Sequence, residues 1–233
     1  MRILAFETSA KAASVALMED EHLVGESYQN TGLTHSQTLM VMAEDLMKQC
    51  GTDANGIDAV AVAEGPGSFT GVRIGVAAAK GFAWGRQIPC YGVSTLQAMA
   101  ESLGAFRGIV CSVMDARRSQ VYNALFRAEN GKLTRLTEDR AISLEQLGNE
   151  LKILSEPVFL VGDGSILCYN TLDSIVPTLV MPAGHRMHQR AVGVGLVASR
   201  MAKEGLAPSG NELTPNYLRL SQAERERLEK EKK

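Results

Sequence analysis

The chain repeats one plan of strands and turns after about 105 residues, and this internal repeat restricts its fold more than any other feature. Each half opens with an apolar segment that ends in a carboxylate, Ile3 to Glu7 in the first half and Ile109 to Asp115 in the second. A short polar turn and a second apolar segment follow each of them. A period of this length indicates duplication of a whole domain, because the repeats of solenoids are much shorter.

Periodicity predicts an alternation of strands and helices. Alternating or continuous short apolar runs predict strands, and apolar residues at helical spacing predict helices. In the first half the expected strands are 2–7, 13–19, 22–28, 58–63 and 88–92, and the expected helices are 35–50, 71–85 and 94–103. Ser94 has the side chain that an N-cap needs. In the second half we expect strands at 109–115, 120–126 and 158–161, a hairpin turn at Asn130-Gly131 and a helix near 189–203.

Two similar α/β halves that each open with a meander are typical of the actin/hexokinase/Hsp70-like (ASKHA) fold, a duplicated two-domain α/β fold with mixed sheets. Ligands of such sheets gather at the carboxyl ends of the strands, so Glu7, Asp115 and 162–164 are expected to face an interdomain cleft. An equally weighted alternative is that both carboxylates only cap their own turns. We predict an N-terminal half at 1–105 and a C-terminal half at 106–233, whose charged tail could pack back on the first half.

The stretch from Asp58 to Arg86 joins an apolar strand to a glycine-rich turn and then to a helix rich in alanine and glycine. Such an arrangement commonly cradles phosphate, because free N–H groups at the helix start face the ligand. The spacing nevertheless fits neither familiar fingerprint. Counting from Gly65, Thr70 stands where a P-loop needs its second glycine, and Gly71 comes one residue too late for the dinucleotide-binding pattern. The motif alone therefore predicts neither an ATPase nor a dehydrogenase.

Charge and the distribution of apolar residues argue against a nucleic-acid-binding, a membrane or a secreted protein. Lys and Arg number 24 and Asp and Glu number 26, so a chain that binds nucleic acid by itself is not expected. No apolar run approaches the ~18 residues of a membrane span, and the segment before Glu7 is too short for a signal peptide. The four cysteines form no C-x-x-C pair, which favours free thiols in a reducing compartment. We expect a cytoplasmic protein with no membrane partner.

Several segments carry a family resemblance. The most specific is GPGSFTGVRIG at Gly65–Gly75, and the region 130–190 matches least well. The other segments, in chain order, are ILAFETSAKAASVALME, THSQTLM, GVSTLQAMA, MDARRSQVYNALF and PNYLRLSQAE. Together they span nearly the whole chain, which on these residues resembles the bacterial TsaB family, also called YeaZ.

The resemblance implies a role in making N6-threonylcarbamoyladenosine (t6A) at position 37 of tRNAs that read ANN codons. Members of this family are non-catalytic partners of a paralogue, TsaD, which transfers the threonylcarbamoyl group. A small ATPase, TsaE, completes the bacterial complex. The resemblance further implies a homodimer when the chain is alone, contact with tRNA only through the complex, and no cofactor of its own. It also implies ATP or ADP at the junction with TsaD.

Departures from the usual motifs favour a pseudoenzyme. The first carboxylate, usually Asp, is Glu7 here, and Arg117 stands where the second hairpin often has glycine. The tentative nucleotide-binding residues are Glu7, Gly67, Ser68, Arg73 and Asp115. A small-molecule kinase or ATPase that uses Glu7 and Asp115 with Mg²⁺ is the alternative function.

No metal site is expected. TsaD relatives carry H-x-x-x-H on their first helix, and here His35 is followed four residues later by Leu39, which cannot bind a metal. This substitution also argues against a metalloprotease, the third possibility. His185 and His188 are three residues apart but lie in the half that matches least well.

Two helices could form a partner surface. In the first, Leu39, Met42, Ala43 and Leu46 make one apolar stripe. In the second, small residues recur every four positions, which lets another helix approach closely. The expected interface residues are His35, Leu39, Met42, Leu46, Gly71, Gly75, Ala78, Ala79 and Phe82. The pattern fits a helix buried in its own core about as well. The charged tail 221–233 is expected to be a solvated helix or a frayed end.

Overall fold

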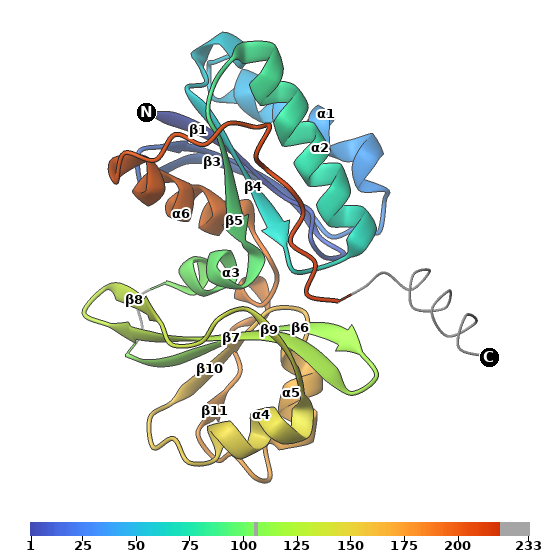
Figure 1. Cartoon of the computed structure of the whole chain (residues 1–233), viewed down its shortest axis with the longest axis vertical. Coiled ribbons are helices and arrows are strands. Elements are labelled where there is room, and N and C mark those ends of the chain that lie inside the picture. Colours follow the sequence, from blue (N-terminus) through green and yellow to red (C-terminus); the bar gives the residue numbers. More distant parts are fainter. Residues whose placement is uncertain (105–106, 220–233) are drawn as a thin grey trace, which may run out of the picture.

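The computed structural model describes residues 1–104 and 107–219, which form two lobes stacked end to end (Figure 1). A five-stranded mixed sheet in the order β3-β2-β1-β4-β5 is the centre of the first lobe. Its strands are β1 (Arg2–Glu7), β2 (Ala13–Glu19), β3 (His22–Gln29), β4 (Ala59–Gly65) and β5 (Cys90–Ser94). β1 pairs antiparallel with β2 and parallel with β4.

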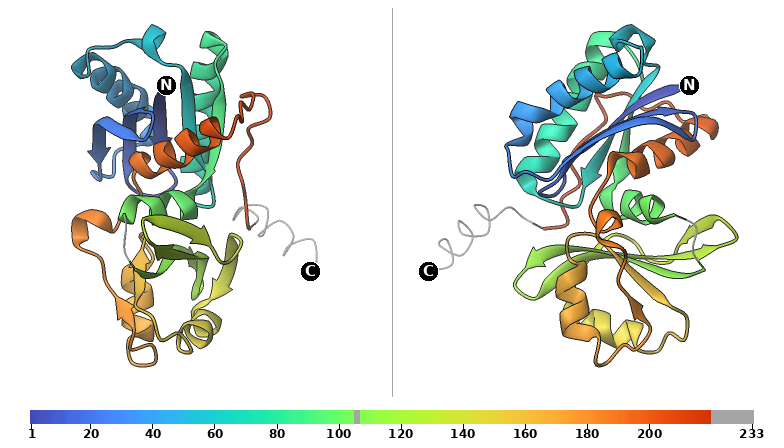
Figure 2. Two further views of the ribbon diagram at one scale, coloured as in Figure 1. Left: turned by 90° about the vertical axis from the view of Figure 1, so that its left-hand side faces the viewer. Right: turned by 180° about the vertical axis from the view of Figure 1, so that it is seen from behind.

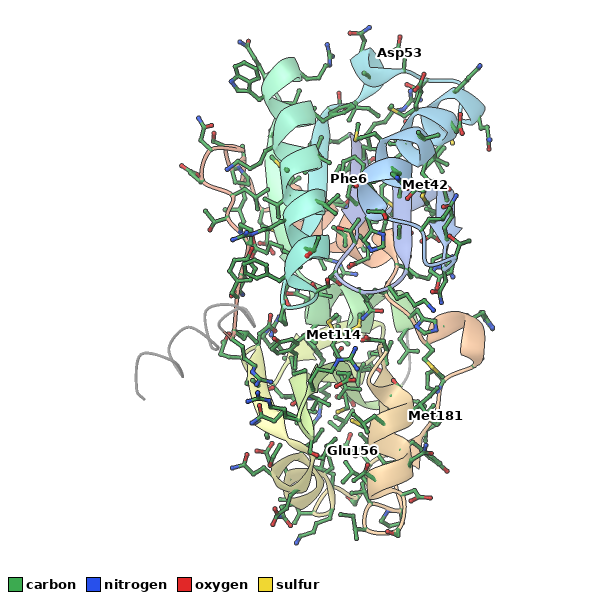
Figure 3. All side chains as sticks on the ribbon, turned by 90° about the vertical axis from the view of Figure 1, so that its right-hand side faces the viewer. Phe6, Met42, Asp53, Met114, Glu156 and Met181 are labelled. Carbon is green, nitrogen blue, oxygen red and sulfur yellow. The ribbon has the colours of Figure 1, made fainter. Side chains whose placement is uncertain are left out.

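Helices cover both faces of this sheet, because its central strands are apolar on both sides. Leu4 and Phe6 of β1 point to the face covered by α1 (His35–Gln49) and α2 (Phe69–Arg86). Ile3, adjacent to Leu4 in sequence, points to the face covered by α6 (Ala191–Lys203). Side chains of a strand alternate in this way, so one strand serves two cores. Figure 3 shows Phe6 and Met42 in the layer between the sheet and α1.

The second lobe repeats the plan. Its sheet has the order β11-β10-β6-β7-β8, and β9 also pairs with β7. The strands are β6 (Gly108–Arg117), β7 (Gln120–Glu129), β8 (Lys132–Arg135), β9 (Arg140–Ser143), β10 (Val158–Val161) and β11 (Leu179–Val180). The helices α4 (Leu144–Leu151) and α5 (Ser165–Leu172) pack on its outer face. Two 3-10 turns, η1 (Ala54–Gly56) and η2 (Gly184–Arg186), complete the elements.

The helix α3 (Thr95–Leu103) lies between the two sheets and joins their cores (Figure 1). Its buried Leu96 and Met99 pack in one cluster with Val110 and Phe126 of the second sheet. The predicted N-cap is confirmed, since the Ser94 hydroxyl accepts a hydrogen bond of 3.2 Å from the Gln97 N–H. The predicted duplication is also confirmed: β6 pairs antiparallel with β7 and parallel with β10, as β1 does with β2 and β4.

After the second lobe the chain returns to the first. The helix α6 covers the first sheet, and the Ala191 N–H donates to the Ser14 hydroxyl at 3.1 Å. We call the described residues that follow, Leu206–Arg219, the C-terminal strap; it passes over the first lobe towards the boundary between the lobes (Figure 2). A division after residue 105 would therefore separate α6 from the sheet that it covers. The charged tail 221–233 lies outside the described residues.

The strap is attached by backbone hydrogen bonds. The Cys90 N–H donates to the Pro208 carbonyl at 3.0 Å, and the Asn216 N–H donates to the Glu64 carbonyl at 2.7 Å. Leu213 is buried in the core between the sheet and α2. The strap is therefore packed on the first lobe, and the last residues of the strap reach the cleft between the lobes.

Candidate functional site

A cleft of about 530 Å³ lies where the two lobes meet, at the level of Met114 in Figure 3. Its walls come from the two hairpin turns, the glycine-rich turn before α2 and the end of the strap. Asp115 and Asp163 line the cleft, as the position of strand ends in the sequence predicts. Gly67 and Ser68 line it as well. Four residues expected at this site from sequence are thus brought together.

Glu7 is placed differently from what the sequence predicts. Its side chain is fully buried beneath the cleft, and one carboxylate oxygen accepts a hydrogen bond of 2.6 Å from the Ser9 N–H. The other oxygen, Oε2, has no hydrogen-bond partner among the described residues. Burial, with a smaller contribution from the nearby Asp163 carboxylate, raises the pKa of Glu7 from 4.5 to about 7. The expectation that Glu7 faces the cleft is therefore wrong.

Asp115 lines the cleft but also caps its own turn. One oxygen accepts from the Arg117 N–H at 2.7 Å, and the other accepts from the Arg117 guanidinium at 3.1 Å. The turn that it caps holds Arg117, Arg118 and Ser119 at φ values of 65°, 56° and 56°, a region that residues other than glycine rarely adopt. The interpretation of Asp115 as a turn-capping residue is confirmed. Its oxygens are engaged by its own hairpin.

The glycine-rich turn does not present an open phosphate cradle. The Ser68 N–H donates to the Ser9 carbonyl at 2.6 Å, and a Cβ on Gly67 would lie 2.5 Å from the same oxygen. The Ser68 hydroxyl accepts from the Gly71 N–H at 3.3 Å as the N-cap of α2. The first hairpin therefore occupies the space beside the helix start where a phosphate would bind. Asp115 lines the cleft and Glu7 does not, so the two carboxylates do not face one ligand position.

Arg73 is held on the surface by aromatic side chains. Its guanidinium lies 3.9 Å from the centre of the Phe69 ring, and its Nε donates to the Tyr217 hydroxyl at 2.8 Å. The Phe69 and Tyr217 rings stack with their centres 4.5 Å apart. This group ties the strap to the start of α2. Arg73 thus makes its contacts within the chain, and it is not among the residues that line the cleft.

Most residues expected at a partner interface are in the core. Leu39, Met42, Leu46 and Ala79 are buried between α1, α2 and the sheet. A Cβ on Gly71 or Gly75 would lie 2.1 or 2.4 Å from atoms of the first hairpin, so these glycines admit that hairpin and not a second chain. The assignment of these six residues to an exposed interface is therefore wrong. Of the remainder, Ala78 and Phe82 are half-buried beside the core, and the His35 Nε2 is 2.8 Å from the Ala10 carbonyl oxygen.

The opposite face of the same helices is exposed and carries apolar side chains that were not singled out from sequence as exposed. We call it the outer helix face. It includes Met40, Val41 and Trp84, whose exposed fractions are 44%, 57% and 81%. We include in it Gly81 and Gly85 of α2, which with Trp84 line a hollow of about 980 Å³ beside strap residues 207–211. A Cβ on either glycine would meet no described atom within 4 Å. Nothing in the described fold accounts for glycine at these two helical positions.

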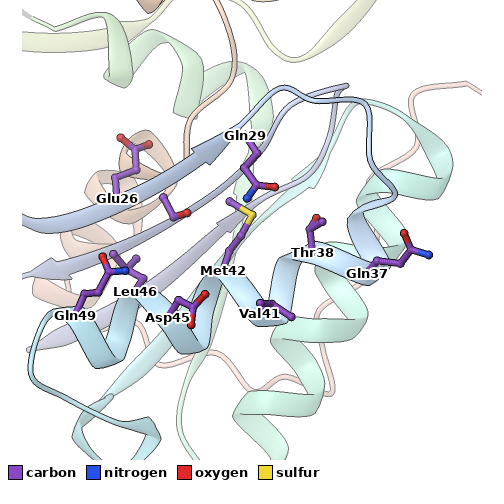
Figure 4. Close-up of a pocket in the computed structure, with 10 residues that line it drawn as sticks. Glu26, Gln29, Gln37, Thr38, Val41, Met42, Asp45, Leu46 and Gln49 are labelled. Carbon is purple, nitrogen blue, oxygen red and sulfur yellow. The ribbon is translucent and has the colours of Figure 1, made fainter.

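A groove of about 280 Å³ adjoins this face, between α1 and the edge strand β3 (Figure 4). Val41, Met42 and Asp45 line it from the helix, and Glu26 and Gln29 line it from the strand. The groove makes the outer helix face uneven next to α1. A partner side chain of moderate size could enter there.

The described residues hold neither a metal-ligand cluster nor a membrane-spanning helix. Within 1–104 and 107–219, no group of three or more His, Cys, Asp and Glu side chains is arranged to hold a metal ion. Leu39, at the position of the second histidine in H-x-x-x-H, is a buried core residue. All four cysteines are free, as predicted. None of the described helices has the length and apolar character needed to span a membrane.

Comparison with known proteins identifies the family. Residues 29–226 match the family model described as TsaD, tRNA N6-adenosine threonylcarbamoyltransferase. The tRNA threonylcarbamoyladenosine biosynthesis protein TsaB of Bacillus subtilis is 32% identical over 235 residues, covering 100% of both chains. The protein of that name from Escherichia coli is 36% identical over 167 residues, covering 70% of this chain and 72% of its own.

Solved structures support the same placement. A Pseudomonas aeruginosa protein described as similar to peptidase YEAZ has a TM-score of 0.82 at 26% identity, covering 94% of this chain and 99% of that one. A ROK hexokinase from Thermus thermophilus has a TM-score of 0.51 at 10% identity, covering 88% of this chain and 100% of that one, and it confirms the predicted ASKHA fold class alone. With a relative that matches along the whole chain and a family model that matches most of it, this chain belongs to the TsaB (YeaZ) family.

Proposed function

We propose that this chain is a non-catalytic subunit that pairs with TsaD in the complex that forms t6A at position 37 of ANN-decoding tRNAs. The names of its relatives and the match to the TsaD family model support a place in t6A biosynthesis. The observation that carries the pairing role is the outer helix face, with its exposed apolar side chains and its two glycines. We place this role in the cytoplasm.

The two glycines support close contact with a second helix. Glycine inside a helix destabilises it by about 0.5–1 kcal/mol relative to alanine. At Gly71 and Gly75 this cost is offset by close packing within the chain, but a Cβ added to Gly81 or Gly85 would meet no described atom within 4 Å. A partner helix lying against α2 gives these positions a use. The exposed Trp84 nearby is the residue type that most often anchors protein interfaces.

The arrangement of the cleft supports a role without catalysis. Glu7 is buried, Asp115 is engaged by Arg117, and the first hairpin fills the space beside the start of α2. None of these groups is free to orient a nucleophile or a metal-bound phosphate. If ATP or ADP binds at the junction with TsaD, Gly67 and Ser68 would contribute only part of that site.

The outer helix face would have two uses that exclude each other. Alone, the chain would pair with a second copy through this face. In the presence of TsaD, the same face would pair with the paralogue. TsaE would join the assembled complex, and tRNA would be bound by the complex and not by this chain alone.

The test is size-exclusion chromatography with light scattering, on the chain alone and mixed with TsaD of the same organism. We expect a homodimer that exchanges into a 1:1 heterodimer. A Cβ at Gly81 would meet no described atom within 4 Å, so the variant Gly81→Arg, which places a long side chain on the outer helix face, should stay folded and lose both pairings. The matched control is Asn170→Arg, at an exposed position of α5 in the other lobe, and it should pair normally.

A heterodimer that still forms with Gly81→Arg would show that the surface is assigned wrongly. A chain that ignores TsaD would overturn the proposed function itself.

A kinase or ATPase of the same fold is the second candidate. It is favoured by the fold likeness to the hexokinase and to a dehydratase activator solved with ADPNP, which has a TM-score of 0.53 at 12% identity, covering 88% of this chain and 97% of that one. Calorimetry with Mg-ATP separates the two functions. Tight binding by the isolated chain that is lost in Asp115→Ala would support the enzyme.

A further inference from the structure

We propose that positively charged side chains around the interlobe cleft contact the phosphate backbone of tRNA in the assembled complex. We call these residues, Lys11, Arg117, Arg118 and Arg219, the basic rim. The inference rests on the proposed function, because a subunit of the t6A complex would meet tRNA. It goes further, because it assigns some of the contacts with tRNA to residues of this chain.

The basic rim is assembled from three separate segments. Lys11 comes from the first hairpin, Arg117 and Arg118 from the second, and Arg219 from the end of the strap. Lys11, Arg117 and Arg219 all line the same cleft, and Arg118 follows Arg117 on the hairpin. The Arg219 guanidinium donates to the Ala116 carbonyl at 2.6 Å, which fixes the strap against the second hairpin. Segments far apart in sequence thus bring three cations to one opening, and Arg118 follows one of them in the chain.

Three of these cations are available to a ligand. The Arg117 side chain is 85% exposed although it touches Asp115. Lys11 and Arg118 are exposed and make no hydrogen bond or ion pair with the described residues. Long cationic side chains that serve stability usually lie along apolar surface or pair with carboxylates. Lys11 and Arg118 have no carboxylate partner in the described structure.

The local charge differs in sign from that of the whole chain. The chain has a formal net charge of −2. Three cations of the rim and two carboxylates, those of Asp115 and Asp163, line the cleft, and Glu7 is buried beneath. Because burial holds the pKa of Glu7 at about 7, this group carries only part of a negative charge at neutral pH. The opening is therefore positive and attracts polyanions.

The second hairpin holds its arginines in an unfavourable backbone conformation. Arg117, Arg118 and Ser119 all have positive φ, where a residue with a Cβ is disfavoured and glycine is not. Strain of this kind persists where the surrounding structure enforces it, commonly at functional sites. Asp115 and the hydrogen bond from the Leu144 N–H to the Ser119 carbonyl enforce it here. The result is two consecutive exposed arginines in one constrained turn, of which Arg117 lines the cleft.

RNA is the occupant that these groups fit best. Guanidinium groups bind phosphate oxygens through paired N–H donors, which suits them to a phosphate backbone. Tyr217, 38% exposed, borders the same cleft and offers an aromatic side chain next to the rim. Aromatic and cationic side chains side by side are the usual means of holding unpaired nucleotides. An acidic segment of a protein partner would use the cations but not the aromatic ring.

The experiment measures the salt dependence of tRNA binding by the heterodimer with TsaD, using fluorescently labelled tRNA and anisotropy. The variant is Arg117→Gln combined with Arg118→Gln. Affinity decreases as salt increases, so the slope of log affinity against log salt is negative. Relative to wild type, the variant should have a slope whose magnitude is smaller by about one for each phosphate that is no longer neutralised, hence by about two. The control, Arg127→Gln with Lys132→Gln, removes the same charge near the other end of β7 and should leave the slope unchanged.

The outcomes separate this inference from the proposed function. Light scattering first establishes whether wild type, variant and control all pair with TsaD. Failure of the wild type to pair overturns the proposed function. If all three pair and the variant has the same slope as the control, the basic rim does not contact RNA and the inference is wrong. The same holds if the variant instead loses affinity for TsaD, because the rim then binds an acidic protein surface.

Discussion

The backbone N–H of Ser68 donates a hydrogen bond of 2.6 Å to the carbonyl oxygen of Ser9. Ser68 is the N-cap of α2, and Ser9 belongs to the hairpin between β1 and β2. A glycine-rich turn that leads into a helix could hold phosphate through such an N–H group. Here the hairpin satisfies the donor, so the turn supports the fold. A cleft is present between the lobes, and Gly67 of the turn lets the first hairpin pack closely against it.

Substitution of Gly67 and Gly81 should therefore have opposite effects on stability. A Cβ on Gly67 would lie 2.5 Å from the Ser9 oxygen, so Gly67→Ala should lower the free energy of unfolding by about 1–3 kcal/mol, as overpacking does. Gly81→Ala meets no described atom and should raise it by about 0.5–1 kcal/mol. Urea unfolding of the two variants checks this. Equal effects would mean that the first hairpin does not hold the turn as described.

The buried carboxyl of Glu7 should make stability depend on pH. Its pKa is about 7 in the folded protein and 4.5 when unperturbed, so the folded state binds the proton more tightly. The loss of folding stability caused by ionising buried Glu7 is absent below pH 4.5, grows as the pH rises to 7 and is constant above. Glu7→Gln removes the charge at nearly the same volume. The variant should be more stable than wild type at pH 8 by roughly 3 kcal/mol, with most of the difference gone at pH 5.

Unfolding of both proteins in urea at pH 5 and pH 8 measures this difference. Burial also raises the pKa of Asp163, which is present in both proteins, so only the part of its titration that is coupled to Glu7 differs between them. A stability difference that is the same at both pH values would contradict the buried, partly protonated state of Glu7.

The strap should loosen when its aromatic contact is removed. Tyr217→Ala eliminates the stack on Phe69 and the hydrogen bond from Arg73. Hydrogen exchange at the Asn216 amide, which donates to the Glu64 carbonyl, should become faster while exchange in β1 stays slow. Tyr28→Ala is the control, because Tyr28 has the same exposed fraction of 38% but lies on β3. Equal protection of Asn216 in both variants would show that the stack does not hold the strap.

The sequence predicts the fold well because its signals are local and repeated. Both meanders, the Ser94 cap and the turn at Asn130-Gly131 depend on neighbouring residues, and the structure contains them all. The site is predicted less well, because burial depends on distant segments. Whether Glu7 faces a cleft or a core is decided by the hairpin and loop packed over it. Likewise α6 lies in the second half of the sequence but covers the first sheet.

The small residues of α2 show the same limit. Gly71, Gly75 and Ala79 share one stripe, but spacing alone does not tell whether that stripe faces its own domain or another chain. Gly81 lies two residues after Ala79, about 200° further round a helix of 3.6 residues per turn. Two glycine-containing stripes on opposite sides of one helix cannot both face the same sheet. This offset was present in the sequence and could have indicated an outer face.

The exposed and buried sides of α1 give the sharpest test of pairing. Val41 is 57% exposed and Leu46 is 5% exposed. Val41→Glu should change the free energy of unfolding by less than about 0.5 kcal/mol, as surface substitutions do. Leu46→Glu should cost at least about 2–5 kcal/mol, the effect of losing a buried leucine alone, because it also buries a charge. Thermal unfolding followed by circular dichroism compares them.

If the outer helix face pairs with TsaD, Val41→Glu should abolish the heterodimer in light scattering while the monomer stays folded. Leu46→Glu should lose pairing only together with its fold, so it cannot report on the interface. Lys48→Glu, at an exposed position of the last turn of α1, introduces the same acidic side chain near the end of the helix and is the control. A folded Val41→Glu protein that pairs as well as this control would place the TsaD contact elsewhere, because a carboxylate buried at a helix–helix interface without a partner costs several kcal/mol.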